Sequence, residues 1–483
     1  MKGFFMQPRV NFEQPNQLSR YKAILGVGAV FVTQFGSFLF INARNIAQPG
    51  MIAELDGMAL FSWLIALPAL AGAAGTLLSG KLSDVYGRRA VLLASLGIFA
   101  LGLGLTAMVK SMPALVAVTT FMSIGHWPII PLCFSAIGDL FPPAERAKWT
   151  GLLNLPGGIA AFIGPVLGGV VAESALGWRG LYWGTIPLML TAAGLLAAAL
   201  PNPAQTIRPK MDIAGMVVMV FATSALIFGV SWLGQAGKFA MGALLLVLSL
   251  AAWGAFLQIE KRAEAPILDP QILANRTFIT AAGTGLLSFF GTVSILAYSP
   301  IFVQEVMRVS PTMSGSMLTP YTVLAALIGI PAGLLLSKTG KYKGMYLLGY
   351  GLGTLALFML WRLTAESPAW LYVLATSLAG LGLGGLLTLN TLVAQFAVPK
   401  RLLGSAVGAV FFFQMVGIAV APSLLGLLQR SAPTLESGLK LVFLAGALAL
   451  LLGLLIIATI PQISMEGEAA EAGEPLPAIP AES

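Results

Sequence analysis

The pattern of hydrophobic and polar positions divides the chain into fourteen long apolar segments separated by shorter polar ones. Each segment has about the 20 residues that a helix needs to cross a bilayer. We expect spanning helices near residues 23–42, 57–79, 90–109, 113–137, 150–173, 180–200, 213–234, 239–258, 277–303, 313–336, 344–361, 369–396, 404–428 and 438–460. The pattern therefore predicts an all-α polytopic membrane protein with fourteen transmembrane helices.

Two polar linkers, 201–212 and 260–276, set the seventh and eighth segments apart and give a layout of six, two and six helices. A count of twelve would require the pair at 213–258 to lie elsewhere, and both members are too long and too apolar for that. We expect these parts: a cytoplasmic segment 1–22, a six-helix bundle 23–200, linkers with two additional helices 201–276, a second six-helix bundle 277–460, and a disordered cytoplasmic tail 461–483.

Composition agrees with a membrane protein, because 57% of the residues are hydrophobic and only 10% are charged. With both termini in the cytoplasm, 19 of the 27 Lys and Arg residues fall in inner segments, which favours this orientation in a cell membrane. The net charge of +8 is explained by anionic lipid headgroups, not by nucleic acid. One cysteine, Cys133, and one histidine exclude a disulfide framework and a Cys- or His-rich metal site. We expect no cofactor, no cleavable signal peptide and a monomer.

A short charged loop lies between the second and third segments at residues 80–89. Gly80 and Gly87 permit the turn, Asp84 can accept hydrogen bonds at a helix start, and Arg88 and Arg89 mark the cytoplasmic side. An ordinary positive inside loop would also carry such charge. The spacing resembles the major facilitator superfamily signature G-x-L-(a/s)-D-r-x-G-R-(R/K). The resemblance implies a conformational gate formed by these residues.

The fifth segment contains small residues at four-residue spacing together with a proline, and this pattern allows close helix packing and a bend. Residues 157–169 resemble the antiporter signature g-x-x-x-G-P-x-x-G-G, with Ala160 in place of the first glycine. The matching positions are Gly164, Pro165, Gly168 and Gly169. The resemblance implies export, whereas the alternative is generic small-residue packing.

The fourth segment closes with Asp139 followed by residues 140–146. This ending resembles the D-l-f-P-p-x-e-R pattern of the same superfamily, with Arg146 as its last residue. Asp139 and Arg88 both fall at the cytoplasmic face, so an ion pair between them would latch the second and fourth helices. An exposed pair contributes only about 0–1 kcal/mol. The alternative is a solvated loop charge.

Residues 177–183 resemble the W-R-W-i-F-x-i-N-x-P segment of the 14-helix drug/proton antiporters, and the linker 260–269 and the six-two-six layout also fit that family. The resemblance covers nearly the whole chain. It implies export of small amphipathic or hydrophobic compounds, of the multidrug-efflux and drug-resistance type, by alternating access coupled to protons. Its partners are then a small-molecule substrate, protons and membrane lipids.

Helix 1 departs from the family pattern L-D-x-T-I-V-N-V-A-L-P, because Phe40 stands where the acid belongs and Arg44 adds a cation. The family's R-x-x-Q-G pattern falls on Thr119, Met122 and Ser123, and no carboxylate lies in the middle of a spanning segment. The acid that carries the proton in this family is therefore missing. An alternative function is a dedicated exporter or facilitator of one metabolite, lipid or anion. A non-transporting sensor or scaffold is a third alternative. The loop motif at 80–89 and the glycine-rich motif at 157–169 argue against it, because both serve a bundle that moves.

Neutral polar residues remain at membrane depth, and together they suggest a mid-membrane cavity: Gln34, Asn45, Tyr298, Asn390 and Gln414. Their alternative role is hydrogen bonding between helices. An intramembrane charge is a functional candidate, so Arg44 is a candidate substrate contact. Otherwise it reaches the outer headgroups or pairs with Glu54 or Asp56. His126 titrates in the physiological range and could carry the coupled proton, unless it is a neutral side chain bonded within the bundle.

Overall fold

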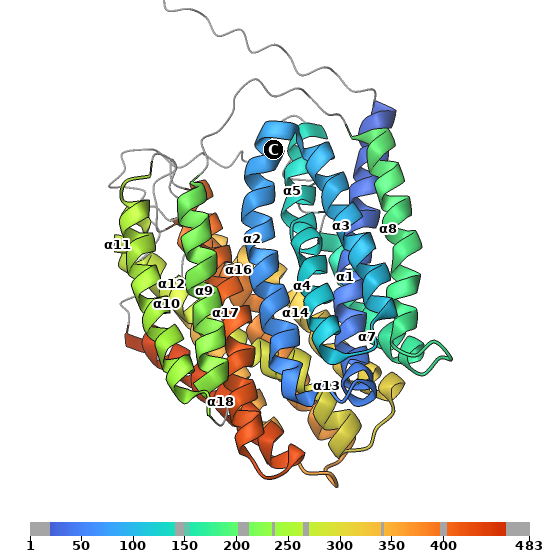
Figure 1. Ribbon diagram of the computed structural model, residues 1–483, viewed down its shortest axis with the longest axis vertical. Helices are drawn as coiled ribbons and strands as arrows, with labels where there is room; N and C mark the ends of the chain where they lie inside the picture. The colour runs from blue at the N-terminus through green and yellow to red at the C-terminus, as the bar shows by residue number, and fades with distance from the viewer. Residues whose placement is uncertain are drawn as a thin grey trace, which may run out of the picture.

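The computed structural model describes residues 20–140, 149, 152, 154–200, 212–233, 237–263, 270–339, 342–396 and 403–459. Every regular element in these residues is helical, and the long helices run roughly side by side (Figure 1). This confirms the predicted all-α polytopic membrane fold. Most of the predicted cytoplasmic segment and of the linker 201–212, residues 264–269 of the second linker, and the C-terminal tail lie outside the described residues.

The N-terminal half surrounds α1, which packs against α5, α7 and α8. Its apolar core includes the rings of Phe40, Phe99 and Tyr182. One predicted helix is broken in two, because Pro128 follows His126 and offers no backbone N–H. The elements are α1 (Arg20–Glu54), η1 (Met58–Leu60), α2 (Phe61–Tyr86), α3 (Arg88–Met108), α4 (Met112–His126), α5 (Ile129–Leu140), α7 (Asn154–Ala172) and α8 (Arg179–Ala199).

The C-terminal half is a second bundle in which α14 packs on α16 and α15 packs on α16 and α18. Its first long helix contains two π-helical turns, η2 and η3, and such turns are frequent at functional sites. The elements are α11 (Pro270–Ala274), α12 (Arg276–Val293), η2 (Ser294–Tyr298), α13 (Ser299–Ile301), η3 (Phe302–Val306), α14 (Pro311–Thr339), α15 (Lys343–Arg362), α16 (Ala369–Phe396), α17 (Leu403–Ser431) and α18 (Leu435–Thr459).

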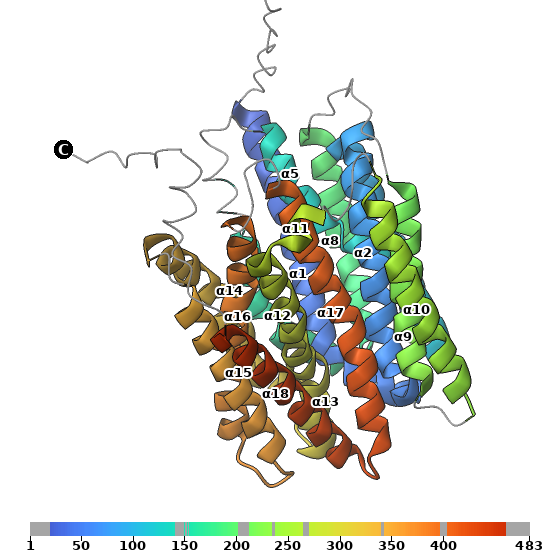
Figure 2. The same ribbon diagram turned by 90° about the vertical axis from the view of Figure 1, so that its left-hand side faces the viewer.

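The two additional helices, α9 (Ile213–Leu233) and α10 (Phe239–Glu260), form a hairpin at the side of the two halves (Figure 2). α9 contacts both α2 of the N-terminal half and α17 of the C-terminal half. α10 packs mainly on α9, and only 17% of its most apolar 18-residue stretch is buried. The hairpin therefore lies beside the seam between the halves, and α10 faces outward.

Twelve helical segments of the described residues are long and apolar enough to cross a membrane. The α4–α5 pair counts as one such segment, and so does the stretch from α12 through η3. α14 and α17 are each 29 residues long and stand in the places of the tenth and thirteenth predicted helices. They are not among the twelve, so a count of fourteen stays a prediction.

Helix 1 extends well beyond its predicted end near residue 42, because α1 continues to Glu54. The prediction stopped where Asn42, Arg44 and Asn45 interrupt the apolar run. In the structure this polar stretch is buried or half-buried against neighbouring helices, so it does not end the membrane-embedded helix. Composition alone could not reveal that burial.

Candidate functional site

The two halves meet along two seams, one between α7 and α14 and the other between α2 and α17. In the first seam the backbones approach closely. A Cβ atom added at Gly169 would lie 2.5 Å from the carbonyl oxygen of Pro311, and one added at Gly315 would overlap the carbonyl of Pro165. Side chains larger than hydrogen therefore do not fit at either position without a shift of the helices.

The other motif glycines of α7 face α1 within the N-terminal half. A Cβ atom at Gly164 would lie 2.5 Å from Cβ of Asn42, and one at Gly168 would overlap the backbone of Ala43. The glycine pattern thus serves two contacts at once. Gly164 and Gly168 attach α7 to α1, while Gly169 lets α14 approach from the other half.

In the described part of the chain, hydrogen bonds between the halves cluster toward the end at which α1 finishes and α2 begins. We call this the outer end after the predicted orientation. Gln304 Nε2 donates to the carbonyl of Ile46 at 3.1 Å. Arg430 Nη1 donates to the carbonyl of Ala59 at 2.7 Å. Deeper in the seam, Thr322 Oγ1 donates to the carbonyl of Ala161 at 2.6 Å. The outer side is therefore closed in this conformation.

Glu173 adds a charged contact to this closure. It follows α7, and its Oε1 accepts the backbone N–H of Thr312 at 2.9 Å in the first turn of α14. That backbone hydrogen bond, helped by the side chains of Thr312 and Ser310, lowers the pKa of the Glu173 carboxyl below its usual value of 4.5. A carboxylate at this place also interacts favourably with the α14 dipole. Sequence analysis did not single out this residue.

The loop between α2 and α3 has the tight turn that its glycine predicts, because Gly87 lies between the two helices with φ of 85°. Arg88 Nη1 donates to the carbonyl of Ser135 in α5 at 3.0 Å, and Arg89 Nη1 donates to that of Leu200 at 3.3 Å. Gly80 is exposed. The two arginines thus tie the loop to neighbouring helices of the N-terminal half.

Two acids and one arginine expected at this gate fall wholly or partly outside the described residues. The side chains of Asp84 and Asp139 and the whole of Arg146 lie outside the described part of the structure. Ser135, which accepts from Arg88, is one helical turn before Asp139 on α5. The Arg88–Asp139 pair and the role of Asp84 stay predictions.

His126 lies inside the N-terminal half at the end of α4 and is 5% exposed. Its Nε2 is 2.8 Å from Oγ of Ser37 on α1. Its ring stacks on Phe99 with centroids 4.2 Å apart and meets Phe40 edge-on at 5.6 Å. A hydroxyl and two aromatic rings therefore hold the imidazole, and Phe40 occupies the place of the family's acid beside it.

Arg44 points toward α2, where its Nη2 approaches the carbonyl of Leu64 at 3.4 Å. Pro68 stands four residues later in α2, so this carbonyl lacks its usual intrahelical donor. Nε of Arg44 is buried without a hydrogen-bond partner. Glu54 does not serve Arg44, because it pairs with Arg179 and accepts from Trp178 Nε1 at 2.7 Å.

The amides predicted at membrane depth lie on α1, α16 and α17, and all but Asn45 are buried. Oε1 of Gln34 on α1 and Nε2 of Gln414 on α17 are buried without a hydrogen-bond partner. Asn390 Oδ1 accepts from the hydroxyl of Tyr346 at 2.8 Å, inside the C-terminal half. Asn45 is half-buried on α1.

Tyr298 lies at the meeting of the halves and has no exposed surface. Its ring contacts Phe61 of α2 edge-on at 5.1 Å, and its hydroxyl approaches the carbonyl of Pro422 on α17 at 3.4 Å. The sequence prediction placed it in a substrate pathway. The structure places it in the outer part of the α2–α17 seam, at the last residue of the π-helical turn η2.

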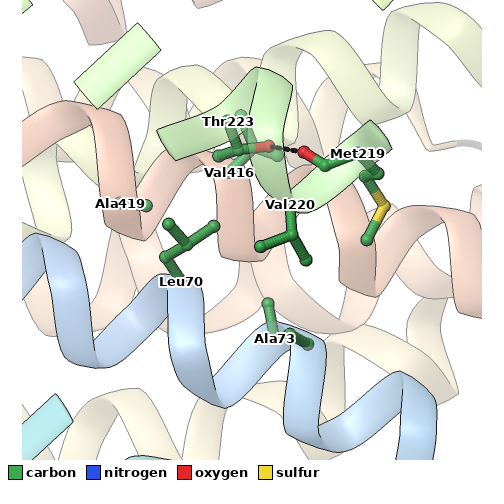
Figure 3. A pocket seen from close by; sticks show the side chains of 8 residues that line it. Leu70, Ala73, Met219, Val220, Thr223, Val416 and Ala419 are labelled. Atoms are coloured by element: carbon green, nitrogen blue, oxygen red, sulfur yellow. Dashed lines mark hydrogen bonds between the residues drawn. The ribbon is translucent and has the colours of Figure 1, made fainter. Parts of the chain in front are cut away.

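A narrow apolar pocket lies where α9 covers the α2–α17 seam (Figure 3). The lining residues come from these three helices: Leu70, Ala73, Ala74, Met219, Val220, Thr223, Val416 and Ala419. The hydroxyl of Thr223 donates to the carbonyl of Met219 at 2.9 Å, so the one polar group of the lining is satisfied. The pocket thus suits apolar groups only. Within the described residues, no three His, Cys, Asp or Glu side chains are grouped as metal ligands.

Comparison with known proteins identifies the chain's relatives. Residues 30–422 match the family model described as Major Facilitator Superfamily. An uncharacterised MFS-type transporter of Mycobacterium tuberculosis is 28% identical across 84% of this chain, and the match spans only 60% of that relative's length. Multidrug transporter protein MdtP of Bacillus subtilis is 27% identical across 85% of this chain and 76% of its own. Multidrug resistance protein 3 of the same organism is 26% identical across 80% and 76%.

Solved structures share the fold at low sequence identity. The peptide transporter POT, in complex with alafosfalin, has a TM-score of 0.67 at 16% identity and covers 90% of this chain and 93% of its own. A bacterial homologue of the human lysosomal transporter Spinster, in an inward-facing and unoccupied conformation, has a TM-score of 0.65 at 14% identity and covers 91% and 97%.

Proposed function

Because the chain belongs to the major facilitator superfamily, we propose that it exports small amphipathic or hydrophobic compounds by alternating access, as a multidrug-efflux transporter. The closed outer side, with the glycine-proline helix α7 packed backbone to backbone on α14, is the observation that carries this proposal. The names of the two Bacillus subtilis relatives support the substrate class.

Alternating access requires the halves to rock about a site between them. In this conformation the contacts of Gln304, Arg430 and Glu173 hold the outer ends together. Substrate would enter while these contacts are made and leave after they break. The protein would act in the cell membrane with both termini in the cytoplasm, as a monomer in contact with lipids.

The proposal is tested by efflux from cells and by transport in proteoliposomes with and without an imposed pH gradient. A lipophilic fluorescent dye is a suitable substrate. We expect dye accumulation to fall in cells that express the protein and to be restored by Asp84→Asn at equal expression. Equal accumulation with and without the protein, over several dyes of different charge, would contradict multidrug export.

Proton coupling is a separate part of the proposal, and His126 is its candidate carrier. In the outer-closed conformation His126 is 5% exposed, so proton exchange requires a conformation that opens the bundle around it. His126→Gln keeps much of the size and can still bond Ser37, but it cannot cycle a proton. We expect gradient-driven accumulation to be lost while downhill exchange persists. If coupling survives, His126 has a structural role.

A dedicated exporter or facilitator of an anion is the second candidate, and Arg44 favours it. This cation lies within the membrane span, and one of its nitrogens is buried without a partner. Arg44 is half-buried, and a charge at such a place is stabilised by a compensating group, which an anionic substrate would supply. Arg44→Gln and Arg44→Lys should then reduce transport of an anionic substrate more than that of a neutral one, with Gln the more severe. Equal effects on both substrates would refute the anion assignment.

A further inference from the structure

Pro165 leaves one carbonyl of α7 without its usual hydrogen bond. In a regular helix the N–H of residue 165 would donate to the carbonyl of residue 161, and proline has no N–H. The carbonyl of Ala161 is therefore free to accept from outside the helix. Ala161 is 5% exposed, so an unsatisfied carbonyl there would be costly.

The missing donor is supplied by the opposite half of the molecule. Thr322 of α14 is 6% exposed, and its Oγ1 is 2.6 Å from the Ala161 carbonyl oxygen. Close approach of the two helices makes this possible, because Gly315 of α14 lies against the backbone of Pro165. Pro165 thus leaves the Ala161 carbonyl free as an acceptor, and Gly315 lets α14 come close enough for the Thr322 hydroxyl to donate to it.

The same hydroxyl has a second acceptor in its own helix. Oγ1 of Thr322 is 2.9 Å from the carbonyl oxygen of Thr319. A threonine hydroxyl carries a single proton, so it can make one good hydrogen bond at a time. When α14 moves away from α7, the proton can turn to Thr319 without leaving the donor unsatisfied. The Ala161 carbonyl then faces the opened seam, where water can reach it.

We propose that Thr322 is a positioning residue whose hydroxyl switches acceptors between the carbonyls of Ala161 and Thr319 as the α7–α14 seam closes and opens. Pro165 supplies the acceptor of the closed state. The switch favours closure by one hydrogen bond and adds no buried unsatisfied donor in the open state. This proposal rests on the proposed alternating access. It assigns Pro165 of α7 a role beyond bending the helix.

The test measures the ratio of outer-open to outer-closed protein by distances between two spin labels. The labels are placed on exposed outer residues of the two halves, through Leu176→Cys and Trp370→Cys in a Cys133→Ala background. Thr322→Val keeps the shape and removes the donor. We expect the open-to-closed ratio to rise about fivefold, as for the loss of one net hydrogen bond. Thr322→Ser should restore the original ratio.

Thr319→Val is the matched control, because the Thr319 hydroxyl donates to the carbonyl of Gly315 in its own helix at 2.9 Å. It should leave the ratio unchanged. Pro165→Ala gives the sharper test, since alanine returns an N–H to the Ala161 carbonyl. In that background Thr322→Val should have little further effect.

Several results would overturn the proposal. They are an unchanged ratio in Thr322→Val, an equal change in Thr319→Val, failure of Thr322→Ser to restore the ratio, or full additivity with Pro165→Ala. The measurement uses the protein in lipid nanodiscs without substrate or gradient. Its failure would therefore leave the export proposal standing, and absence of export would leave the measured switch intact.

Discussion

Replacement of Glu173 by glutamine should weaken the closure of the outer side. Its carboxylate accepts the N–H of Thr312 at 2.9 Å, and the two residues belong to opposite halves. Glutamine keeps the length and an amide oxygen but loses the charge. The change therefore tests the charge of this contact and leaves its shape nearly intact.

The magnitude follows from the position of Glu173. A negative charge at an exposed helix N-terminus contributes about 0.3–1 kcal/mol, and the Glu173 side chain is exposed. Since about 1.4 kcal/mol corresponds to a factor of ten, we expect Glu173→Gln to raise the outer-open to outer-closed ratio roughly twofold to fivefold. The label pair on Leu176 and Trp370 measures this ratio directly.

The pH dependence has a defined sign. The pKa of Glu173 is lowered in the closed state, so the closed state is favoured while the carboxyl is ionised and loses this advantage as the pH falls below the ordinary value of 4.5. The open fraction should therefore grow below about pH 4.5 in the parent protein and not in Glu173→Gln. Glu366→Gln is the control, because this exposed acid lies in the α15–α16 loop. An unchanged ratio in Glu173→Gln, or an equal shift in the control, would refute the reasoning.

Two further changes probe the packing inside each half. Gly164→Ala places a Cβ atom 2.5 Å from Cβ of Asn42, so α1 and α7 must shift, and we expect a loss of about 1–3 kcal/mol of stability in thermal unfolding. Gly158→Ala, where an added Cβ meets nothing within 4 Å, should cost far less, and similar losses in both would argue against a close contact at Gly164. Tyr346→Phe leaves the buried Asn390 oxygen without its donor and should cost about 1–3 kcal/mol, whereas the exposed Tyr86→Phe should be neutral. Equal unfolding midpoints for Tyr346→Phe and the parent would contradict that estimate.

Features that depend on local sequence could be predicted. The apolar runs located the long helices, because each run must be buried or face lipid. Gly87 adopts a positive φ at the predicted turn between α2 and α3. The break after His126 could also be anticipated in principle from Pro128, since proline disrupts a helix.

Contacts between distant parts of the chain could not be predicted. Glu173 and Thr312 are 139 residues apart, and Ala161 and Thr322 are 161 apart, so no local pattern joins them. The sequence did contain half of the second contact, because Pro165 implies a free carbonyl at Ala161. Its donor depends on how the two halves dock. Likewise, Arg44 and Glu54 are near in sequence, but Arg179 from another helix pairs with Glu54.

The position of α9 has a mechanical consequence for the transport cycle. This helix touches α2 and α17, which belong to opposite halves and must change their separation when the halves rock. Under the proposed alternating access, α9 cannot keep all its contacts with both helices, so part of this packing must be remade in each cycle. The lining of this junction is apolar apart from Thr223, whose hydroxyl bonds within α9, and it includes the short side chains Ala73 of α2 and Ala419 of α17. We expect the additional hairpin to repack against one half whenever the two halves change their separation.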